Sequence, residues 1–431
     1  MSRLVVITWA LLPLTVDGWN QDVHYAGAKL VEDLLPREDL DRLLQKNGDL
    51  TCYINWPDSN HRPGSMSGDS ERFGWSMASH FVNMPSGEEY NRDQAESLRV
   101  METPNAVNSL RHFREKLLFY KDFKRVVYIN AKMKVLDEAL YDGQNDFNKV
   151  ALLERFKRES TYSIAHYFQD LHNPFHCGDQ QDMGGFKHSV QCGFCADNKT
   201  TTVHTLWDAD MFDHELRGVF KRNYIDQMAG FEQERYPFQE TLYKMMREKY
   251  DFLLLIHPEL VRGWYTECSG EFDSCIDTVV SETRQYFLDN KEALYVGAQG
   301  TVVTEAYLDR FLDAALMQVM KSSVRLAAAL RRISAELRQT EGFMVQQRGN
   351  STCEEEFRDD PERSQFQSDR VLTISAQAAA VIPSARVSFH RRVFIFLSTT
   401  CAHSEAAHGV AYHETSLRLA KAKASTQPHS Y

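Results

Sequence analysis

Apolar residues recur every three to four positions through five long stretches of this 431-residue chain, and that period confines most of the chain to amphipathic helices. The stretches are Tyr25–Leu44, Leu110–Leu140, Val150–Phe168, Tyr236–Ile256 and Ala306–Leu337. Alternation with a period of two is scarce, whereas residues 177–202 are rich in Gly, Asp, Gln and Cys, which favours a loop or a short hairpin. We therefore predict an all-α fold, a helical bundle interrupted by one short loop or hairpin.

The two ends of the chain differ from this helical body. Residues 1–18 resemble a secretory signal peptide, because a basic residue precedes the apolar run Leu4–Leu14 and small residues precede a cleavage point before Trp19. A buried first helix is the alternative, which the shortness of the run disfavours. We expect residues 19–337 to form one domain and residues 338–431, where the periodicity fades, to be a weakly ordered extension. The chain contains no run of 18 or more apolar residues, so the sequence predicts no membrane span.

Eight cysteines in a chain with an expected signal peptide favour disulfide bonds. The segment Cys192-Gly-Phe-Cys195 is also compatible with a metal knuckle or a redox pair, but no second close pair follows at zinc-finger spacing. We therefore predict a disulfide there, and we interpret Cys268 and Cys275 in the same way.

Two triplets, beginning at Asn198 and Asn350, are acceptors for glycosylation if the chain enters a eukaryotic secretory pathway. Together with the signal peptide, they indicate a protein that is secreted or held in the lumen of the secretory or endolysosomal system.

The formal net charge of −11 argues against binding of nucleic acid by a broad basic surface, because a polyanion is repelled at long range. Any site that handles phosphate must therefore carry its own local positive charge.

Two histidine–aspartate pairs point to such a site. His166 and Asp170 are four residues apart, so they share one helix face, and a proline after them turns the chain so that His176 can approach from another direction. His204 and Asp208 repeat the spacing on a second predicted helix. A surface ion pair is the plain alternative for one such pair, but imidazole nitrogen combined with carboxylate oxygen on two helices suits a polynuclear zinc site.

Further short motifs occur along the chain in a characteristic order. Trp19-x4-His24 comes first, then Trp-x-Asp ending at Asp58, then His80-Phe81, and then the two pairs above. This order resembles the S1/P1 nuclease family, which consists of secreted, zinc-dependent single-strand nucleases and 3'-nucleotidases. The resemblance covers residue 19 to about residue 337 and implies the helical fold that this family shares with phospholipase C.

The resemblance implies three zinc ions per chain and a ligand set for each. The first set is Asp58, His80, His166 and Asp170. The second set is Trp19, through its free amino nitrogen and carbonyl oxygen, together with His24 and Asp170, which bridges the two ions. The third set is His176, His204 and Asp208. The implied reaction is in-line attack on phosphorus by a hydroxide activated by the metal pair.

The resemblance also directs attention to polar residues close to these ligands. Where the family carries Lys or Arg three positions after the equivalent of Asp58, this chain has His61 followed by Arg62, and either could face the phosphate in the transition state. His172 and His188 match no ligand position, so we expect them to be surface histidines.

Substrate contacts are implied at two places. Phe81 corresponds to an aromatic residue that stacks on the base beside the scissile phosphate, with a core aromatic as the alternative. Asn83 stands where the family has a carboxylate that reads the base edge. Gly184 and Gly185 match the family's site loop, but Phe186 replaces the amide that follows them. These departures leave the base preference open.

The resemblance thus implies an endonuclease that releases 5'-phosphate products from single-stranded DNA and RNA and acts on 3'-nucleotides. It implies zinc as the cofactor and no stable protein partner. A zinc phospholipase C is the nearest alternative, which the short Trp19–His24 spacing and the final ligand Asp208 disfavour. A secreted zinc-binding protein without catalysis is another, which the complete ligand set disfavours.

Overall fold

The computed structural model describes residues 19–46, 48–60, 74–97, 99–100, 103–122, 125–126, 129, 146–195, 198–224 and 236–348. The chain divides into two compact units, Met1–Gly349 and Asn350–Tyr431, and all described residues belong to the first. The expected signal peptide, residues 349–431 of the expected extension, and the candidates His61 and Arg62 lie outside the described residues.

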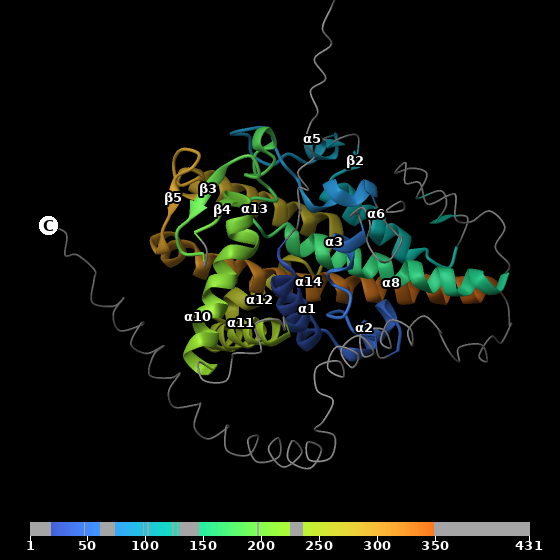
Figure 1. Cartoon of the computed structure of the whole chain (residues 1–431). Coiled ribbons are helices and arrows are strands. Elements are labelled where there is room, and N and C mark those ends of the chain that lie inside the picture. Colours follow the sequence, from blue (N-terminus) through green and yellow to red (C-terminus); the bar gives the residue numbers. More distant parts are fainter. Residues whose placement is uncertain are drawn as a thin grey trace, which may run out of the picture. The chain divides into compact units, whose positions relative to one another are not determined.

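The first unit is built from helices (Figure 1), which confirms the predicted all-α class. Its longer helices are α1 (Gln21–Leu34), α6 (Ala106–Leu118), α8 (Asp146–Asp170), α10 (Met211–Tyr224), α11 (Tyr236–Ile256), α12 (Pro258–Glu267), α13 (Phe272–Leu294) and α14 (Glu305–Arg348). Shorter helical segments are α2 (Arg37–Leu43), α3 (Trp56–Asn60), η1 (Gly74–His80), α5 (Arg92–Ser97), η3 (Gln180–Asp182), α9 (Val203–Thr205) and the π-helical turn η4 (Leu206–Asp210).

Three of the predicted helical stretches differ from the structure. The stretch Tyr25–Leu44 forms α1 and α2 rather than one helix, because Pro36 has no amide hydrogen to donate and forces the preceding Leu35 into an extended conformation. The last predicted helix continues beyond Leu337 to Arg348 as part of α14. The stretch predicted from Leu110 begins inside α6, which ends at Leu118, and most of its remainder lies outside the described residues.

The apolar core has two parts that meet near the end of α8. One part lies among α1, α2, α6, α8 and the C-terminal half of α14, and it includes Leu171. The other lies among α10, α11, α12 and the N-terminal half of α14, and it includes Phe175. The turn that joins Leu171 to Phe175 is therefore packed on both sides, which holds the residues that flank it in place.

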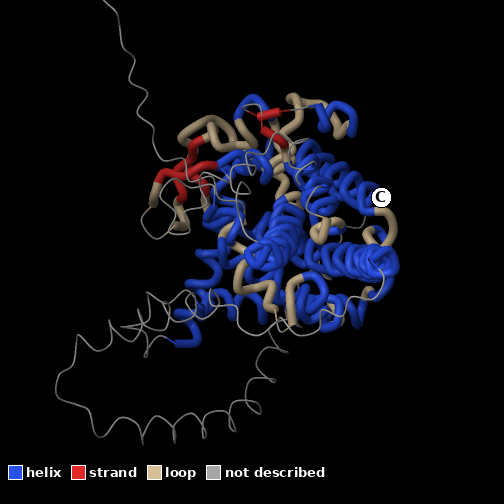
Figure 2. The backbone as a smooth tube through the Cα atoms, turned by 90° about the vertical axis from the view of Figure 1, so that its right-hand side faces the viewer, coloured by secondary structure: helices blue, strands red, loops and turns tan. Residues whose placement is uncertain are grey.

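The segment between the two predicted ligand helices forms a hairpin, as expected. Strands β3 (Ser189–Cys192) and β4 (Thr200–Thr202) pair in an antiparallel manner, and β5 (Val302–Val303) adds to β3 in parallel. Figure 2 shows these strands in red at one edge of the helical body. A separate antiparallel pair, β1 (Arg99–Val100) and β2 (Thr103–Pro104), precedes α6.

Two disulfides are present where they were predicted, between Cys192 and Cys195 and between Cys268 and Cys275. Cys177 departs from the expectation that the cysteines form disulfides, because it is a buried thiol that donates to the Leu171 carbonyl oxygen. Burial raises the pKa of this thiol to about 12, which keeps it protonated. Among the described residues, no helix is both long and apolar enough to cross a membrane.

Candidate metal centre

The last turn of α8 and the reversal after it carry three candidate ligands. His166 and Asp170 lie one turn apart on α8, and both side chains are fully buried. The Asn173 amide donates to the Asp170 carbonyl oxygen (2.8 Å), and the His176 amide donates to the Asn173 carbonyl oxygen (3.0 Å). This turn brings His176 Nδ1 to 4.0 Å from Asp170 Oδ1.

Asp170 occupies the centre of the larger group of side chains. Its Oδ1 lies 3.2 Å from the backbone nitrogen of Trp19 and 3.2 Å from His24 Nε2. Its Oδ2 lies 2.8 Å from His80 Nδ1 and 3.5 Å from His166 Nε2. Each oxygen thus faces its own pair of nitrogens, which is the arrangement that a carboxylate bridging two cations requires.

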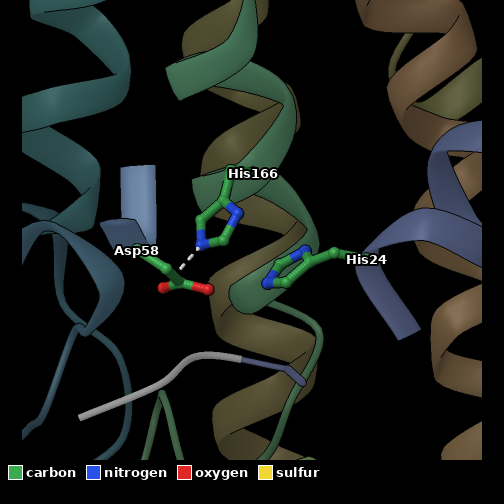
Figure 3. A group of neighbouring side chains, drawn as sticks. All are labelled: His24, Asp58 and His166. Atoms are coloured by element: carbon green, nitrogen blue, oxygen red, sulfur yellow. Dashed lines mark ion pairs between the residues drawn. The ribbon is translucent and has the colours of Figure 1, made fainter. Parts of the chain in front are cut away.

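Asp58 belongs to the same group and comes from α3. Its Oδ1 lies 3.2 Å from His166 Nε2 and 3.7 Å from His80 Nδ1. Figure 3 shows the His166 ring directed at Asp58, with the His24 ring beside it. The rings of His24 and His166 stack with their centroids 3.7 Å apart. Three helices distant in sequence, α1, α3 and α8, therefore deliver these ligands to one buried point.

The smaller group consists of His176, His204 and Asp208. Asp208 Oδ1 lies 3.4 Å from His176 Nε2, and Asp208 Oδ2 lies 2.8 Å from His204 Nε2. Asp208 lies on the π-helical turn η4, a form of helix that occurs frequently at functional sites. Ligand atoms that all lie within 4.8 Å of one another, close enough to share a metal ion, belong to three sets of residues: His24, Asp58 and His166; His80, His166 and Asp170; and His176, His204 and Asp208.

Hydrogen bonds at Nδ1 fix the orientation of four histidines, because each Nδ1 lies 2.6–2.7 Å from an oxygen that accepts its proton. The pairs are His24 with Gln169 Oε1, His166 with the Ile54 carbonyl, His176 with the His80 carbonyl, and His204 with the Gly184 carbonyl. In the neutral ring, each Nε2 then keeps its lone pair. The four Nε2 atoms are buried and make no hydrogen bond to the described residues, although carboxylate oxygens lie within 3.5 Å. Lone pairs that face carboxylates in a buried space call for a cation between them, and this set of donors fits Zn²⁺.

The pKa values indicate the same need for positive charge. Burial alone would lower the pKa of His166, but the carboxylates of Asp58 and Asp170 outweigh burial and raise it to about 9. Burial alone would raise the pKa of Asp58, but His166 outweighs it and lowers it to about 2. In the smaller group, burial raises the pKa of Asp208 to about 8 and lowers the pKa of His204 to about 4. A metal ion would satisfy both groups by taking the place of protons.

The expected substrate residues lie beside the smaller group. Phe81 packs on His176 with 4.6 Å between the ring centroids, and only 8% of Phe81 is exposed. Asn83 is partly buried, and its Oδ1 makes no hydrogen bond to the described residues. Gly184 and Gly185 adopt left-handed conformations with φ of +61° and +86°, which favour glycine. The structure thus brings these four residues together.

His172 is not the surface histidine that the sequence suggested. It is fully buried, its Nδ1 lies 3.0 Å from the Phe168 carbonyl oxygen, and its Nε2 lies 3.4 Å from Arg325. Burial and the positive charge of Arg325 lower the pKa of His172 well below its ordinary value, so it stays neutral. His188 is partly buried, with its ring edge-on to Tyr295 at 5.1 Å. Neither residue joins a ligand group.

Two supporting residues were missed at the sequence level. Gln169 accepts the Nδ1 hydrogen of His24, and Asn173 donates through Nδ2 to Asp208 Oδ1. Both flank Asp170 in the motif, but a single sequence has no signal that a neighbouring amide turns toward a distant ligand.

Comparisons with known proteins cover the same part of the chain. A family model described as S1/P1 Nuclease matches residues 19–335, which include all nine candidate ligands. Endonuclease 3 of Arabidopsis thaliana is 23% identical over 348 residues, which cover 77% of this chain and 95% of that protein. Endonuclease 1 of the same plant is 21% identical, covering 78% of this chain and 94% of that protein. Endonuclease 5 is 22% identical, covering 77% and 96%.

Proposed function

The chain belongs to the S1/P1 nuclease family, and on this premise we propose that it is a zinc-dependent nuclease for single-stranded DNA and RNA. Endonucleases among its relatives support hydrolysis of phosphodiester bonds. The proposed products carry 5'-phosphates, and the enzyme also removes 3'-phosphates from nucleotides. The observation that carries the proposal is the meeting of ligand-type side chains around Asp170, with a second group next to it.

We propose three zinc ions, held by the two groups of side chains. The larger group would hold a pair of ions bridged by Asp170, with the ligands Trp19, His24, Asp58, His80 and His166. The smaller group would hold the third ion, with the ligands His176, His204 and Asp208. When bound, zinc lowers the pKa of water and stabilises negative charge on phosphate, which supplies the local positive field that the acidic chain otherwise lacks.

The protein's own contribution is to hold these groups without rearrangement. Asp170 cannot turn, because both of its oxygens face nitrogens and the chain around it is packed on two sides. The acceptors at Nδ1 hold the four imidazole rings in place and aim Nε2 at the centre. The carboxylates around His166 raise its pKa to about 9, so metal binding displaces a proton from that ring. We propose that His61 and Arg62, which lie outside the described residues, face the phosphate and offset its charge.

The position of Trp19 favours a processed, exported protein. Its backbone nitrogen lies 3.2 Å from Asp170 Oδ1, and its indole Nε1 donates to the Gln169 carbonyl oxygen. A backbone nitrogen can bind zinc well only as a free amine, so cleavage of residues 1–18 would complete the site. The exposed Asn198 and the two disulfides agree with transit through a secretory pathway.

The main experiment measures hydrolysis of single-stranded DNA, RNA and 3'-AMP by protein that begins at Trp19, with and without added zinc. The variant is Asp170→Asn, and the matched control is Asp251→Asn on the exposed face of α11. Zinc-dependent cleavage that is lost only in the first variant supports the proposal. Turnover of phosphatidylcholine in place of nucleic acid would point to a phospholipase, and zinc binding without any turnover would point to a non-catalytic protein.

A second experiment tests the terminal ligand. Protein with two extra residues before Trp19 should lose most of its activity and part of its zinc, because its residue 19 nitrogen is then an amide. Equal zinc content and activity in the two proteins would remove Trp19 from the ligand set.

A further inference from the structure

Phe186 lies directly against the smaller ligand group. Its ring stacks on His204 with centroids 3.7 Å apart and planes 23° apart. Phe81 meets Phe186 edge-on at 5.9 Å and packs its own face on His176 at 4.6 Å. These contacts leave Phe81 only 8% exposed, whereas Phe186 is partly exposed. The aromatic surface open at this point therefore belongs to Phe186 rather than to Phe81.

The loop that carries Phe186 is stabilised by hydrogen bonds and close packing of the residues that precede Phe186. The Gly185 amide donates to Asp182 Oδ1 (3.1 Å), and the Tyr295 hydroxyl donates to Asp182 Oδ2 (2.5 Å). A Cβ on Gly185 would lie 2.7 Å from Val203 Cγ2 and 2.8 Å from the Phe175 ring, so the loop packs closely on its neighbours. Phe186 is thus placed before any substrate arrives, which lowers the entropic cost of a contact with it.

A second observation points to a ligand at the same place. Asn83 Oδ1 is buried and makes no hydrogen bond to the described residues. It lies 3.0 Å from the position that a Cβ on Gly184 would occupy, and so borders the Phe186 loop. A buried acceptor without a partner is costly unless a ligand supplies a donor, such as the exocyclic amine of a nucleobase.

We propose that Phe186 is the residue on which the base of the substrate stacks, with the phosphate at the adjoining ligand groups. The proposal rests on the nuclease function proposed above and names the residue that recognises the nucleoside part of the substrate. Stacking of a base on an aromatic ring is worth about 1–3 kcal/mol and tolerates any base, because every base has a π face. Phe186 would therefore favour nucleotides over base-free phosphoesters while selecting weakly among the bases.

The test compares 3'-AMP with ribose 3-phosphate, which carries the same phosphomonoester without a base. In Phe186→Ala, kcat/KM for 3'-AMP should fall about 5- to 150-fold, the equivalent of that stacking energy, while kcat/KM for ribose 3-phosphate changes less than about twofold. Phe186→Trp should retain the preference for 3'-AMP, and Phe252→Ala, which truncates an exposed aromatic residue on α11, should change neither rate.

Three outcomes would overturn the proposal. An equal loss on both substrates, together with lower zinc content, would show that Phe186 only supports His204. An unchanged rate on 3'-AMP would show that it does not contact the base. A loss of preference in Phe81→Ala but not in Phe186→Ala would place the base on Phe81. If the wild type hydrolysed neither substrate, the 3'-nucleotidase part of the proposed function would fail, and the calorimetric affinity of 5'-AMP for the wild type and Phe186→Ala would decide the stacking separately.

Discussion

Replacement of Gly184 by alanine should destabilise the protein by about 2–5 kcal/mol. Gly184 has a φ of +61°, a conformation that costs a residue with a side chain about 1–2 kcal/mol. The new Cβ would also lie 2.2 Å from the Phe175 carbonyl oxygen and 3.0 Å from Asn83 Oδ1. The backbone must shift to relieve this overlap, which adds about 1–3 kcal/mol.

The same shift should weaken the metal centre. The Gly184 carbonyl oxygen accepts the hydrogen bond from His204 Nδ1 at 2.6 Å, so movement of the backbone disturbs the orientation of a candidate ligand. Loss of such a supporting contact lowers metal affinity by about 10- to 100-fold. We therefore expect Gly184→Ala to bind zinc more weakly in competition with a chelator.

The assay is urea unfolding of zinc-loaded protein, with Gly263→Ala as the matched control. Gly263 lies inside α12, and a Cβ added there would meet no heavy atom within 4 Å. Gly263→Ala should therefore stabilise the protein by about 0.5–1 kcal/mol. If Gly184→Ala unfolded at the same urea concentration as the wild type and bound zinc equally well, the reasoning from the left-handed loop would be refuted.

Three further predictions concern other parts of the unit. Arg284 is fully buried and donates to three carbonyl oxygens and to Asp179, so Arg284→Met should lower the free energy of unfolding by about 3–5 kcal/mol; a loss no larger than that of Arg331→Met would contradict this. Burial and a neighbouring carboxylate raise the pKa of Glu32 from 4.5 to about 7, so its contribution to stability is present below pH 4.5 and is lost as the pH rises through 7. The free energy of unfolding of Glu32→Gln, relative to that of the wild type, should therefore rise across this pH interval by up to about 3 kcal/mol. If urea unfolding gave the same difference between the two proteins at pH 4 and at pH 8, the expectation would be contradicted. A chelator should lower the thermal midpoint of the wild type more than that of Asp170→Asn in calorimetry, whereas equal decreases would show that Asp170 binds no metal.

Local patterns predicted the helices well where nothing interrupts them. The stretch Tyr236–Ile256 matches α11, because its apolar spacing extends through the whole helix. The stretch Tyr25–Leu44 was wrong as a single helix, because periodicity carries no information on the amide hydrogen that Pro36 lacks. Cys192 and Cys195 were paired correctly, since a short loop leaves few alternatives.

Two kinds of information are needed to identify the candidate ligand residues and their ligand atoms. The sequence by itself determined that His166 and Asp170, and likewise His204 and Asp208, could share a site, because residues four apart lie on one face of a helix. The spacing does not say which ring nitrogen faces the metal. That follows from the acceptors at Nδ1, and the acceptor for His166 lies 112 residues away in sequence, at Ile54.

The tertiary structure alone decided the surroundings of the site. His172 is neutral because burial, and after it the charge of Arg325, 153 residues further along the chain, lowers its pKa. Phe81 is covered because the loop after Gly184 and Gly185 brings Phe186 to its edge. Burial and charge at a point are sums over all the neighbours that packing assembles, and a sequence pattern specifies only the few of them that lie within a turn or two of the residue itself.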